Sequence, residues 1–420
     1  MVDTRGTVSI ARADSYAPEV VREALRTALA GLGAPPSNPL GNVVRPGDTV
    51  FIKPNWVAHE YRKSAGRDED VYSTITHPAV IREVADMVAA ALQGSGRLII
   101  GDNPSIDADF GKLRALAGLD DLEHRYDVPC QIRDLRPLRC ADLKDYGVKA
   151  RMQPQAGDPD GHVVVDLGRR SLLQAVDPRR FRGVFTDRTE TVARHTGTRQ
   201  EYEFSASLFN ADVYISIPKL KTHHKVGTTL NLKGLVGSIH NKNLLVHWRT
   251  GWPAVGGDEY PSFAAWAKSH FTRVKQRGAW QGNDTIWRMV VDLYNAFNTR
   301  PRRTLSIVDG IRGGQGDGPF CPVSKDGRAL VVGGDLLAVD CVASRLMGFD
   351  VAQIHYLQHL LHERRWNLDD IRVVGPAGMS GTGFFSSPDP YLGFAPPTHW
   401  PNLTAWQRAV QAASETCVAS

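Results

Sequence analysis

The chain has 420 residues, of which 42% are hydrophobic and 23% are charged, a balance typical of a globular protein with about two to three domains. Its 50 basic and 45 acidic residues give a net charge of +5, an excess too small to indicate a nucleic-acid partner. No segment has the roughly 18 consecutive apolar residues of a membrane span, and the N-terminus lacks an apolar signal core. We therefore expect a cytoplasmic protein without a membrane partner.

The cysteines are few, odd in number and widely spaced, and no two form a C-x-x-C pair. This pattern favours neither a disulfide framework nor a zinc ribbon, and we expect no iron–sulfur cluster. The five residues are Cys130, Cys140, Cys321, Cys341 and Cys417.

Strands and helices alternate along the first quarter of the chain. Thr76 is the expected N-cap of one helix, whose first turn contains Pro78. Alternation of this kind, with polar residues directly after the strands, predicts a mostly parallel α/β sheet. The patterns predict strands at residues 7–12, 47–57 and 97–105 and helices at residues 15–33 and 76–96.

The pattern weakens at residues 106–205 and returns at a strand, residues 213–218. Farther along, the sequence predicts strands at 304–311, 329–333 and 370–376, helices at 284–298, 335–349 and 351–365, and a glycine loop at 312–320. We predict an α/β protein of two lobes, with mostly parallel sheets, helices on both faces and the active-site cleft between the lobes. The lobes would be residues 1–245, with an irregular insertion at about 106–205, and residues 284–375, joined by a lid or connection at 246–283 and followed by a proline-rich tail at 376–420 that wraps the surface.

Polar side chains follow four of the predicted strands. They are Lys53 with Asn55, Asp102 with Asn103, the run Lys219–His224, and the run Asp309–Asp317. Any one of these sets could be the polar start of a solvent-exposed loop. Ligands, however, bind at the carboxyl ends of strands in open α/β sheets. The four together predict a binding site.

The stretch "SIPKLKTHHKVGTTLNLKGLVGSIHNK", residues 216–242, continues one of these strand ends. Lys219 and Lys221 alternate, so an extended chain would direct both ammonium groups to one side, where they could bind a phosphate or carboxylate or lower each other's pKa. Small residues around Thr228 would let the backbone approach a ligand, although the spacing of a P-loop is missing.

Histidines in the same stretch are candidate metal ligands or acid–base groups. His223, His224 and His240 could bind a divalent transition metal, although adjacent residues of a strand face opposite sides. A second row, His355, His359 and His362, shares one helix face and could either chelate a metal or form a solvated surface.

Aspartates mark the C-terminal half. Asp309 and Asp317 flank the predicted glycine loop, whose backbone could lie close to a ligand or form a structural turn. Asp335 has the position of a helix N-cap, and Asp340, inside that helix, is placed to brace the loop.

Several of these segments resemble the bacterial and archaeal family known as domain of unknown function 362. The similar pieces are "VFIKPNWV", "LIIGDNPS", "ADVYISIPKLKTHHKVGTTLNLKGLVGSI" and "SIVDGIRGGQGDGP" followed by "ALVVGGDLLAVDCVASRLMGFD". A weaker similarity is to the nickel-pincer lactate racemases, whose histidine, glycine and cofactor-attaching lysine have the spacing of His223, Gly227 and Lys233. The resemblance implies a two-lobed α/β protein with a site built on histidine and lysine.

These observations lead to a hypothesis of an enzyme of small-molecule, including specialised, metabolism that acts on an anionic carboxylate- or phosphate-bearing metabolite. Epimerase- or isomerase-type proton transfer is the first candidate reaction, because it needs only acid–base groups beside an anion site. Alternatives are a metal-dependent oxidative or hydrolytic enzyme and a non-catalytic ligand-binding protein, and a homo-oligomer is left open. The candidate catalytic residues are His223, His224, Lys221, Lys233 and Asp102, and the candidate substrate contacts are Lys53, Asn55, Lys219, Thr228, Asn231, Asp309 and Asp317.

Overall fold

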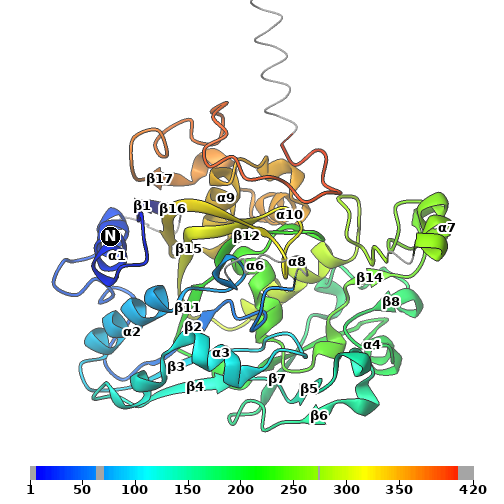
Figure 1. Ribbon diagram of the computed structural model, residues 1–420, viewed down its shortest axis with the longest axis horizontal. Coiled ribbons are helices and arrows are strands. Elements are labelled where there is room, and N and C mark those ends of the chain that lie inside the picture. Colours follow the sequence, from blue (N-terminus) through cyan, green and yellow to red (C-terminus); the bar gives the residue numbers. More distant parts are fainter. Residues whose placement is uncertain (1–5, 63–70, 273–274, 405–420) are drawn as a thin grey trace, which may run out of the picture.

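A ten-stranded mixed sheet forms the centre of the molecule in the computed structural model, which describes residues 6–62, 71–272 and 275–404 (Figure 1). Eight strands form the path β17-β1-β16-β15-β11-β2-β3-β4, while β12 pairs with β15 and β13 pairs with β12. Their bounds are β1 (Thr7–Arg12), β2 (Thr49–Pro54), β3 (Arg97–Asp102), β4 (Cys130–Asp134), β11 (Val213–Ile217), β12 (Lys219–His223), β13 (Gly227–Thr228), β15 (Arg303–Gln315), β16 (Val323–Gly333) and β17 (Arg372–Val374).

Most strand pairs of this sheet are parallel, as predicted. The run β15-β11-β2-β3-β4 is parallel throughout, β1 with β17 and β12 with β15 are also parallel, and antiparallel pairing is confined to β1 with β16, β15 with β16 and β12 with β13. Strands β2, β3 and β11 are continuous apolar runs because both faces of a parallel sheet are covered.

Helices cover both faces of the sheet, and alternate strand residues contribute to two separate cores. Val50 and Ile52 of β2 face one core, which also contains residues of α1 (Pro18–Gly31), α2 (Pro78–Leu92) and α3 (Phe110–Ala117). Phe51, between them, faces the other core, which contains residues of α6 (Leu230–Gly234), α8 (Ile286–Phe297), α9 (Leu336–Leu346) and α10 (His355–Arg364). This period of two is what a strand buried on both sides requires.

Helix caps agree with the sequence patterns at one helix and differ at another. Asp335 caps α9 by accepting a hydrogen bond from the backbone N–H of Ala338 (2.9 Å), as predicted. The N-cap of α2 is His77, whose Nδ1 accepts from Ala79, and not Thr76. The Thr76 hydroxyl instead donates to the Ile217 carbonyl and accepts from the Asn55 backbone, so it links β2 to β11.

Segments from both halves of the chain form the one central sheet, which differs from the two lobes expected. β1 pairs with β16 and β17, and β11 pairs with both β2 and β15, so strands near the N-terminus lie among strands from residues 303–374. Sequence periodicity identifies strands but carries no information on which distant strands become neighbours. No helix in the part of the chain that the structure describes is long and apolar enough to cross a membrane.

Within the region 106–205, which was predicted to be irregular, α3 and β4 belong to the central sheet and its cover. The later part packs beside that sheet together with the segment predicted as a lid. A three-stranded sheet, β7-β10-β9, holds this region, while β8 pairs with β14 of the lid segment. Asp292 of α8 anchors it by accepting hydrogen bonds from Ser171 Oγ, Leu172 N and Tyr202 Oη. The remaining elements are β5 (Leu138–Arg139), β6 (Gln153–Pro154), β7 (His162–Asp166), β8 (Phe181–Arg182), α4 (Thr189–Arg194), β9 (His195–Thr196), β10 (Arg199–Ser205), α5 (Ala206–Phe209), β14 (Trp248–Arg249) and α7 (Phe263–Thr272).

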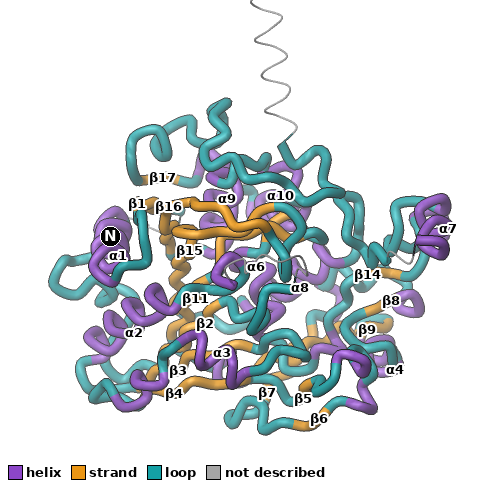
Figure 2. Tube along the Cα trace, in the orientation of Figure 1, coloured by secondary structure: helices purple, strands orange, loops and turns teal. Residues whose placement is uncertain are grey.

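Residues 376–404 contain no helix or strand and run across the molecule as loops (Figure 2). Trp400 is buried and its indole N–H donates to the carbonyl of His224, while the Asp317 carboxylate accepts from Thr398 N and Oγ1. The tail is thereby attached to β12 and to the β15–β16 turn. The rest of the predicted tail, 405–420, with Cys417, lies outside the described residues.

The glycines predicted as a loop at 312–320 mostly belong to a long β15–β16 hairpin. A Cβ at Gly313 would lie 2.5 Å from the Leu220 carbonyl oxygen, and one at Gly314 would lie 2.6 Å from the Ser73 carbonyl oxygen. The glycines therefore allow β12 and the segment at Ser73 to pack directly on β15. At these two glycines the close approach is to neighbouring backbone, which favours the structural one of the two alternatives.

A buried ion pair joins β12 to β15. Lys219 Nζ lies 2.6 Å from Asp309 Oδ2, and both side chains are fully buried. Tyr16 Oη donates to Asp309 Oδ1 (2.8 Å), and the backbone N–H of His77 donates to Oδ2 (2.9 Å). One carboxylate thus connects the segment after β1, the start of α2, β12 and β15.

Replacing Asp309 with asparagine should destabilise the fold by about 3–5 kcal/mol, because it leaves the Lys219 ammonium buried without a counter-charge. The measurement is the free energy of unfolding in urea. Asp326→Asn is the matched control on the same hairpin: Asp326 pairs with Arg312 at an exposed site, so its loss should change stability by less than about 1 kcal/mol. Equal effects of the two substitutions would show that the buried pair is not a principal support of the sheet.

Candidate active site

A cavity of about 710 Å³ lies at the carboxyl ends of β2, β3 and β12. The central sheet contributes Lys53, Asp102 and Lys221, and the stretch after β12 contributes Lys233 and Gly237. The opposite wall comes from the irregular region and the segment after it, at residues 182–186, 247–250 and 275–277. The cavity therefore forms between the edge of the sheet and the segments that pack beside it.

Positive charge dominates the cavity lining. Among the described residues, eight cationic side chains but only two carboxylates line it. The cations are Lys53, Lys221, Lys225, Lys233, Lys242, Lys275, Arg182 and Arg277, and the carboxylates are Asp102 and Glu259. A cavity with this excess repels its own charges and is stabilised by an anionic ligand.

Lys53 and Asp102 form an ion pair at the base of the cavity. Lys53 Nζ lies 2.8 Å from Asp102 Oδ1, while Asp102 Oδ2 accepts from the backbone N–H of Trp56. A Cβ at Gly237 would lie 2.3 Å from Asp102 Oδ1, so only glycine fits over the pair. Asp102, a predicted catalytic residue, is thus held as the partner of Lys53, and Asn55 beside it lines the cavity.

Lys221 is buried beneath the same region and is held by backbone oxygens. Its Nζ donates to the carbonyls of Thr74 (2.6 Å) and Pro319 (3.2 Å). Burial, followed by the charges of Lys219 and Lys233, lowers the pKa of Lys221 well below its ordinary value. These hydrogen bonds fix the position of the Lys221 side chain, which lines the cavity from below.

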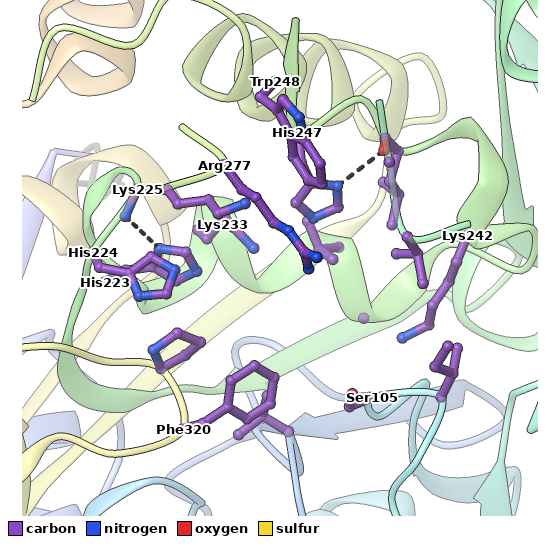
Figure 3. A pocket seen from close by; sticks show the side chains of 18 of the residues that line it. Ser105, His223, His224, Lys225, Lys233, Lys242, His247, Trp248, Arg277 and Phe320 are labelled. Atoms are coloured by element: carbon purple, nitrogen blue, oxygen red, sulfur yellow. Dashed lines mark hydrogen bonds between the residues drawn. The ribbon is translucent and has the colours of Figure 1, made fainter. Parts of the chain in front are cut away.

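Among the described residues, none forms a hydrogen bond or ion pair with the ammonium group of Lys233. It lies on α6 and points into the cavity (Figure 3). Burial, assisted by the charge of Lys53, lowers the pKa of Lys233 to about 8. A lysine with such a pKa has a substantial neutral fraction near physiological pH and can accept a proton.

The orientation of α6 depends on Asp340, which was predicted to brace the glycine loop and instead binds the start of this helix. Its carboxylate accepts hydrogen bonds from Asn231 N (2.9 Å), Asn231 Nδ2 (2.7 Å) and Leu232 N (2.9 Å). The preceding Leu230 has a φ of 42°, in the left-handed region that a leucine rarely adopts. Asp340 and this strained turn together direct Lys233 toward the cavity.

His223 has a fixed tautomer. Its Nδ1 accepts the backbone N–H of Lys225 (3.1 Å), which places the proton of the neutral ring on Nε2. Burial and the nearby Lys233 charge lower the pKa of His223 well below its ordinary value. His223 is therefore a neutral hydrogen-bond donor, comparable in character to an oxyanion-stabilising group, and is poorly suited to act as a base through Nε2.

Two further imidazoles and two further lysines complete the lining. Burial lowers the pKa of His224 to about 3 and that of His247 well below its usual range. Burial also lowers the pKa values of Lys225 and Lys242 to about 7. Figure 3 shows Lys225, Lys233 and Arg277 grouped on one side of the cavity, with Lys242 opposite them.

Five predicted substrate contacts lie elsewhere. Lys219 and Asp309 neutralise each other in the sheet, and Asp317 holds the tail at Thr398. Thr228 Oγ1 pairs with Tyr356 Oη (2.8 Å), and the backbone and amide of Asn231 are bound by Asp340. Lys219, Asp309 and Asp317 were placed in the site because they follow strands, and Thr228 and Asn231 because they belong to the stretch 216–242. Each has a structural partner from a distant part of the chain.

The predicted metal ligands do not form one set. His240 lines a separate, smaller cavity, where its ring stacks on His162 with centroids 4.9 Å apart. Among the described residues no three His, Cys, Asp or Glu side chains are grouped to hold a metal ion, and this includes the row His355, His359 and His362. His223 and His224 lie among lysines, whose charges disfavour a cation, so the residues present do not fit a divalent metal.

Six residues of the cavity lining were not predicted from the sequence. These are Lys225, Lys242, His247, Trp248, Arg182 and Arg277. Lys225 and Lys242 stand in the stretch first singled out, between residues that were chosen, so the density of lysines there was the available signal. The others come from segments without periodicity, and nothing in the sequence links them to the sheet.

Replacing Lys233 with methionine should stabilise the protein at pH 7 by about 2–3 kcal/mol, because the wild type buries an unpaired charge whose pKa is lowered to about 8. Between pH 8 and about 10.5 the unfolded chain keeps this proton while the folded protein loses it, so wild-type stability rises and the gain from the substitution disappears. Urea unfolding from pH 7 to pH 10 measures this change.

Lys221→Met is the contrasting control, since it leaves the carbonyls of Thr74 and Pro319 without a donor and should destabilise the protein. A loss of stability in Lys233→Met at pH 7 would contradict an unpaired, functional lysine.

Proteins of known sequence and structure resemble this chain at low identity. The thylakoid-associated protein sll1697 of Synechocystis sp. is 25% identical over 350 residues, which cover 83% of this chain and 76% of that protein. A crystal structure of a Thermotoga maritima protein aligns over 80% of this chain and 60% of its own, with a TM-score of 0.38 and 10% identity. The lactate racemase apoprotein of Thermoanaerobacterium thermosaccharolyticum aligns over 81% and 58%, with a TM-score of 0.31 and 13% identity.

The chain thus spans about three fifths of each of these two solved structures. One family model also matches, that of "Domain of unknown function (DUF362)", over residues 154–345. This range contains the stretch after β11, the cavity lysines on it and the β15–β16 hairpin. Over residues 154–345 the chain is a match to the DUF362 family, and the resemblance drawn from the sequence is confirmed there.

Proposed function

We propose that the cavity is the active site of an enzyme that binds a small carboxylate- or phosphate-bearing metabolite and transfers a proton beside its anionic group. One observation carries the proposal: Lys233 has a lowered pKa and no partner among the described residues, in a cavity lined by eight cations and two carboxylates. A base that is half neutral near pH 8 and an anion site around it are the requirements for removing a proton α to a carboxylate.

The other lining residues have complementary roles in this proposal. Lys53, Lys225 and Arg277 would hold the anionic group, because their charges are on the cavity surface. The Nε2–H of His223 would donate to the oxygen on which negative charge develops when the proton leaves. Lys233 would take that proton and return it, on the same or the opposite face, which gives exchange or isomerisation.

The two alternatives make different demands on the cavity. A metal-dependent reaction would need a third ligand beside His223 and His224, and the described residues offer none. A non-catalytic binding protein would need the anion site alone, with no role for a base. The experiments below separate these cases.

Anion binding should be accompanied by proton uptake and should weaken as pH rises. Lys225 and Lys242, with pKa values of about 7, and Lys233, with a pKa of about 8, are partly neutral at pH 8, and a bound anion favours their charged forms. We expect malonate and inorganic pyrophosphate to bind at least about tenfold more weakly at pH 9 than at pH 6. Calorimetry at pH 8 in buffers of different ionisation enthalpy measures the uptake, and Lys112→Met, at an exposed site, is the control. Binding that is independent of pH would contradict this electrostatic description.

Proton abstraction can be detected without knowing the product. In D₂O, the enzyme should exchange the Cα hydrogen of a suitable member of a panel of 2-hydroxy acids and phosphorylated hydroxy acids, as followed by proton NMR. Lys233→Met should slow this exchange by about 10²–10⁴-fold, the usual contribution of a general base, while Lys112→Met should not.

Three outcomes oppose the proposal. If Lys233→Met exchanged the Cα hydrogen as fast as the wild type, Lys233 would not be the base. Exchange that is abolished by a chelator would favour metal-dependent chemistry. Tight anion binding without exchange of any panel member would favour the non-catalytic binding protein.

A further inference from the structure

Helix α7 (Phe263–Thr272) lies at the periphery of the molecule, well away from the central sheet (Figure 1). Only Ser269 of its ten residues is buried. Phe271 is 89% exposed and Phe263 is 56% exposed. Two large apolar rings exposed on one short helix are typical of a surface that binds a partner or a membrane.

The aromatic residues of α7 continue onto the loop before it. Trp252 packs against Phe263 and Trp266, with ring centroids 5.2 and 5.3 Å apart, and Phe263 packs on Trp266 at 5.4 Å. Phe263, Ala267 and Phe271, four residues apart, share one face of the helix. We call Trp252, Phe263, Trp266 and Phe271 the aromatic end.

Exposed apolar side chains are concentrated at this end. Six large hydrophobic residues are exposed among the described residues, and Val255, Phe263 and Phe271 lie within a stretch of 17 residues. The remaining three, Tyr146, Val164 and Val323, are in other elements or loops.

The charge around α7 is positive. No Asp or Glu occurs from Pro261 to Asn283, and Lys268, Lys275 and Arg277 in this range are exposed. Arg180 adds a cation beside Trp252, since its guanidinium donates to the Thr250 carbonyl (3.2 Å). Asp258, the nearest buried carboxylate, accepts from the backbone N–H groups of Arg249 and Asp284. The segment 261–283 therefore carries exposed positive charge, of which Lys275 and Arg277 also line the cavity.

We propose that the aromatic end of α7 docks the protein on an anionic lipid surface. Protruding aromatic rings enter the interfacial layer of a bilayer, where amphipathic rings are stable, and flanking Lys and Arg side chains bind the anionic headgroups. A convex end matches a deformable lipid surface better than the rigid groove that a protein partner would have to provide. This attachment needs no membrane-spanning helix.

Cosedimentation with lipid vesicles tests the proposal. The full-length protein is mixed with phosphatidylcholine vesicles with or without an equal part of phosphatidylglycerol. We expect binding to the anionic vesicles that weakens with salt, and at least a tenfold weaker interaction with phosphatidylcholine alone. The double variant Phe263→Ser, Phe271→Ser should require at least ten times more anionic lipid for half-maximal binding.

Two matched variants control for folding and charge. Val164→Ser, Val323→Ser removes exposed apolar residues elsewhere and should bind as the wild type does. Lys268→Gln, on α7 and outside the cavity lining, should bind more weakly and with a smaller dependence on salt. Thermal unfolding of all variants shows whether each is folded.

The proposal is overturned if the wild type does not sediment with anionic vesicles, or if the phenylalanine variant binds them equally well. It is also overturned if sedimentation velocity shows a wild-type oligomer that this variant dissociates, since the partner would then be a second copy of the chain. None of these results depends on the chemistry proposed for the cavity.

Discussion

The buried Asp309 carboxylate fixes the geometry on which the cavity depends. It neutralises Lys219, accepts a hydrogen bond from Tyr16 and receives the first backbone N–H before α2, so four segments meet at one group. Because β12 is thereby aligned with β15, Lys221 and His223, two and four residues beyond Lys219, reach the end of the sheet. A charge buried in this way is tolerated only while its partner is in place, so the strand cannot shift without a large loss of stability.

The lysines of residues 216–242 are separated by their partners into structural and available groups. Lys219 is neutralised by Asp309, and Lys221 donates to backbone carbonyls. Lys53, outside this stretch, pairs with Asp102 and lines the cavity. Lys233 has no comparable partner, and Lys225 has only the face of Trp248, 4.5 Å from its Nζ. The remaining positive charge is therefore concentrated where a ligand can reach it. An anion in the cavity would offset the repulsion that burial leaves between these groups.

The sequence predicted the strand ends that form the base of the cavity, but it did not separate lining residues from structural ones or identify the opposite wall. Lys53, Asp102 and His223 were identified because polar residues after buried strands mark the carboxyl edge of a parallel sheet, and Lys233 because its spacing from His223 is that of the lactate racemases. The same rule also selected Lys219 and Asp309, since the register that pairs them across β12 and β15 is a contact over 90 residues that no local pattern contains. Arg182, His247 and Arg277 come from irregular segments, whose positions depend on long-range packing such as the β8–β14 pair.

The strain around Lys233 supports the role proposed for this lysine. Leu230 adopts a left-handed conformation that costs about 1–2 kcal/mol for a residue with a side chain. Asp340 is buried to hold the turn, and this burial raises its pKa to about 7. Lys233 itself is buried without a counter-charge. Each of these is unfavourable for folding, and all three lie within one turn and the helix beneath it. A chain under selection for stability alone has simpler solutions at this place, whereas a binding site needs a charged group held in a fixed direction and left free for its ligand.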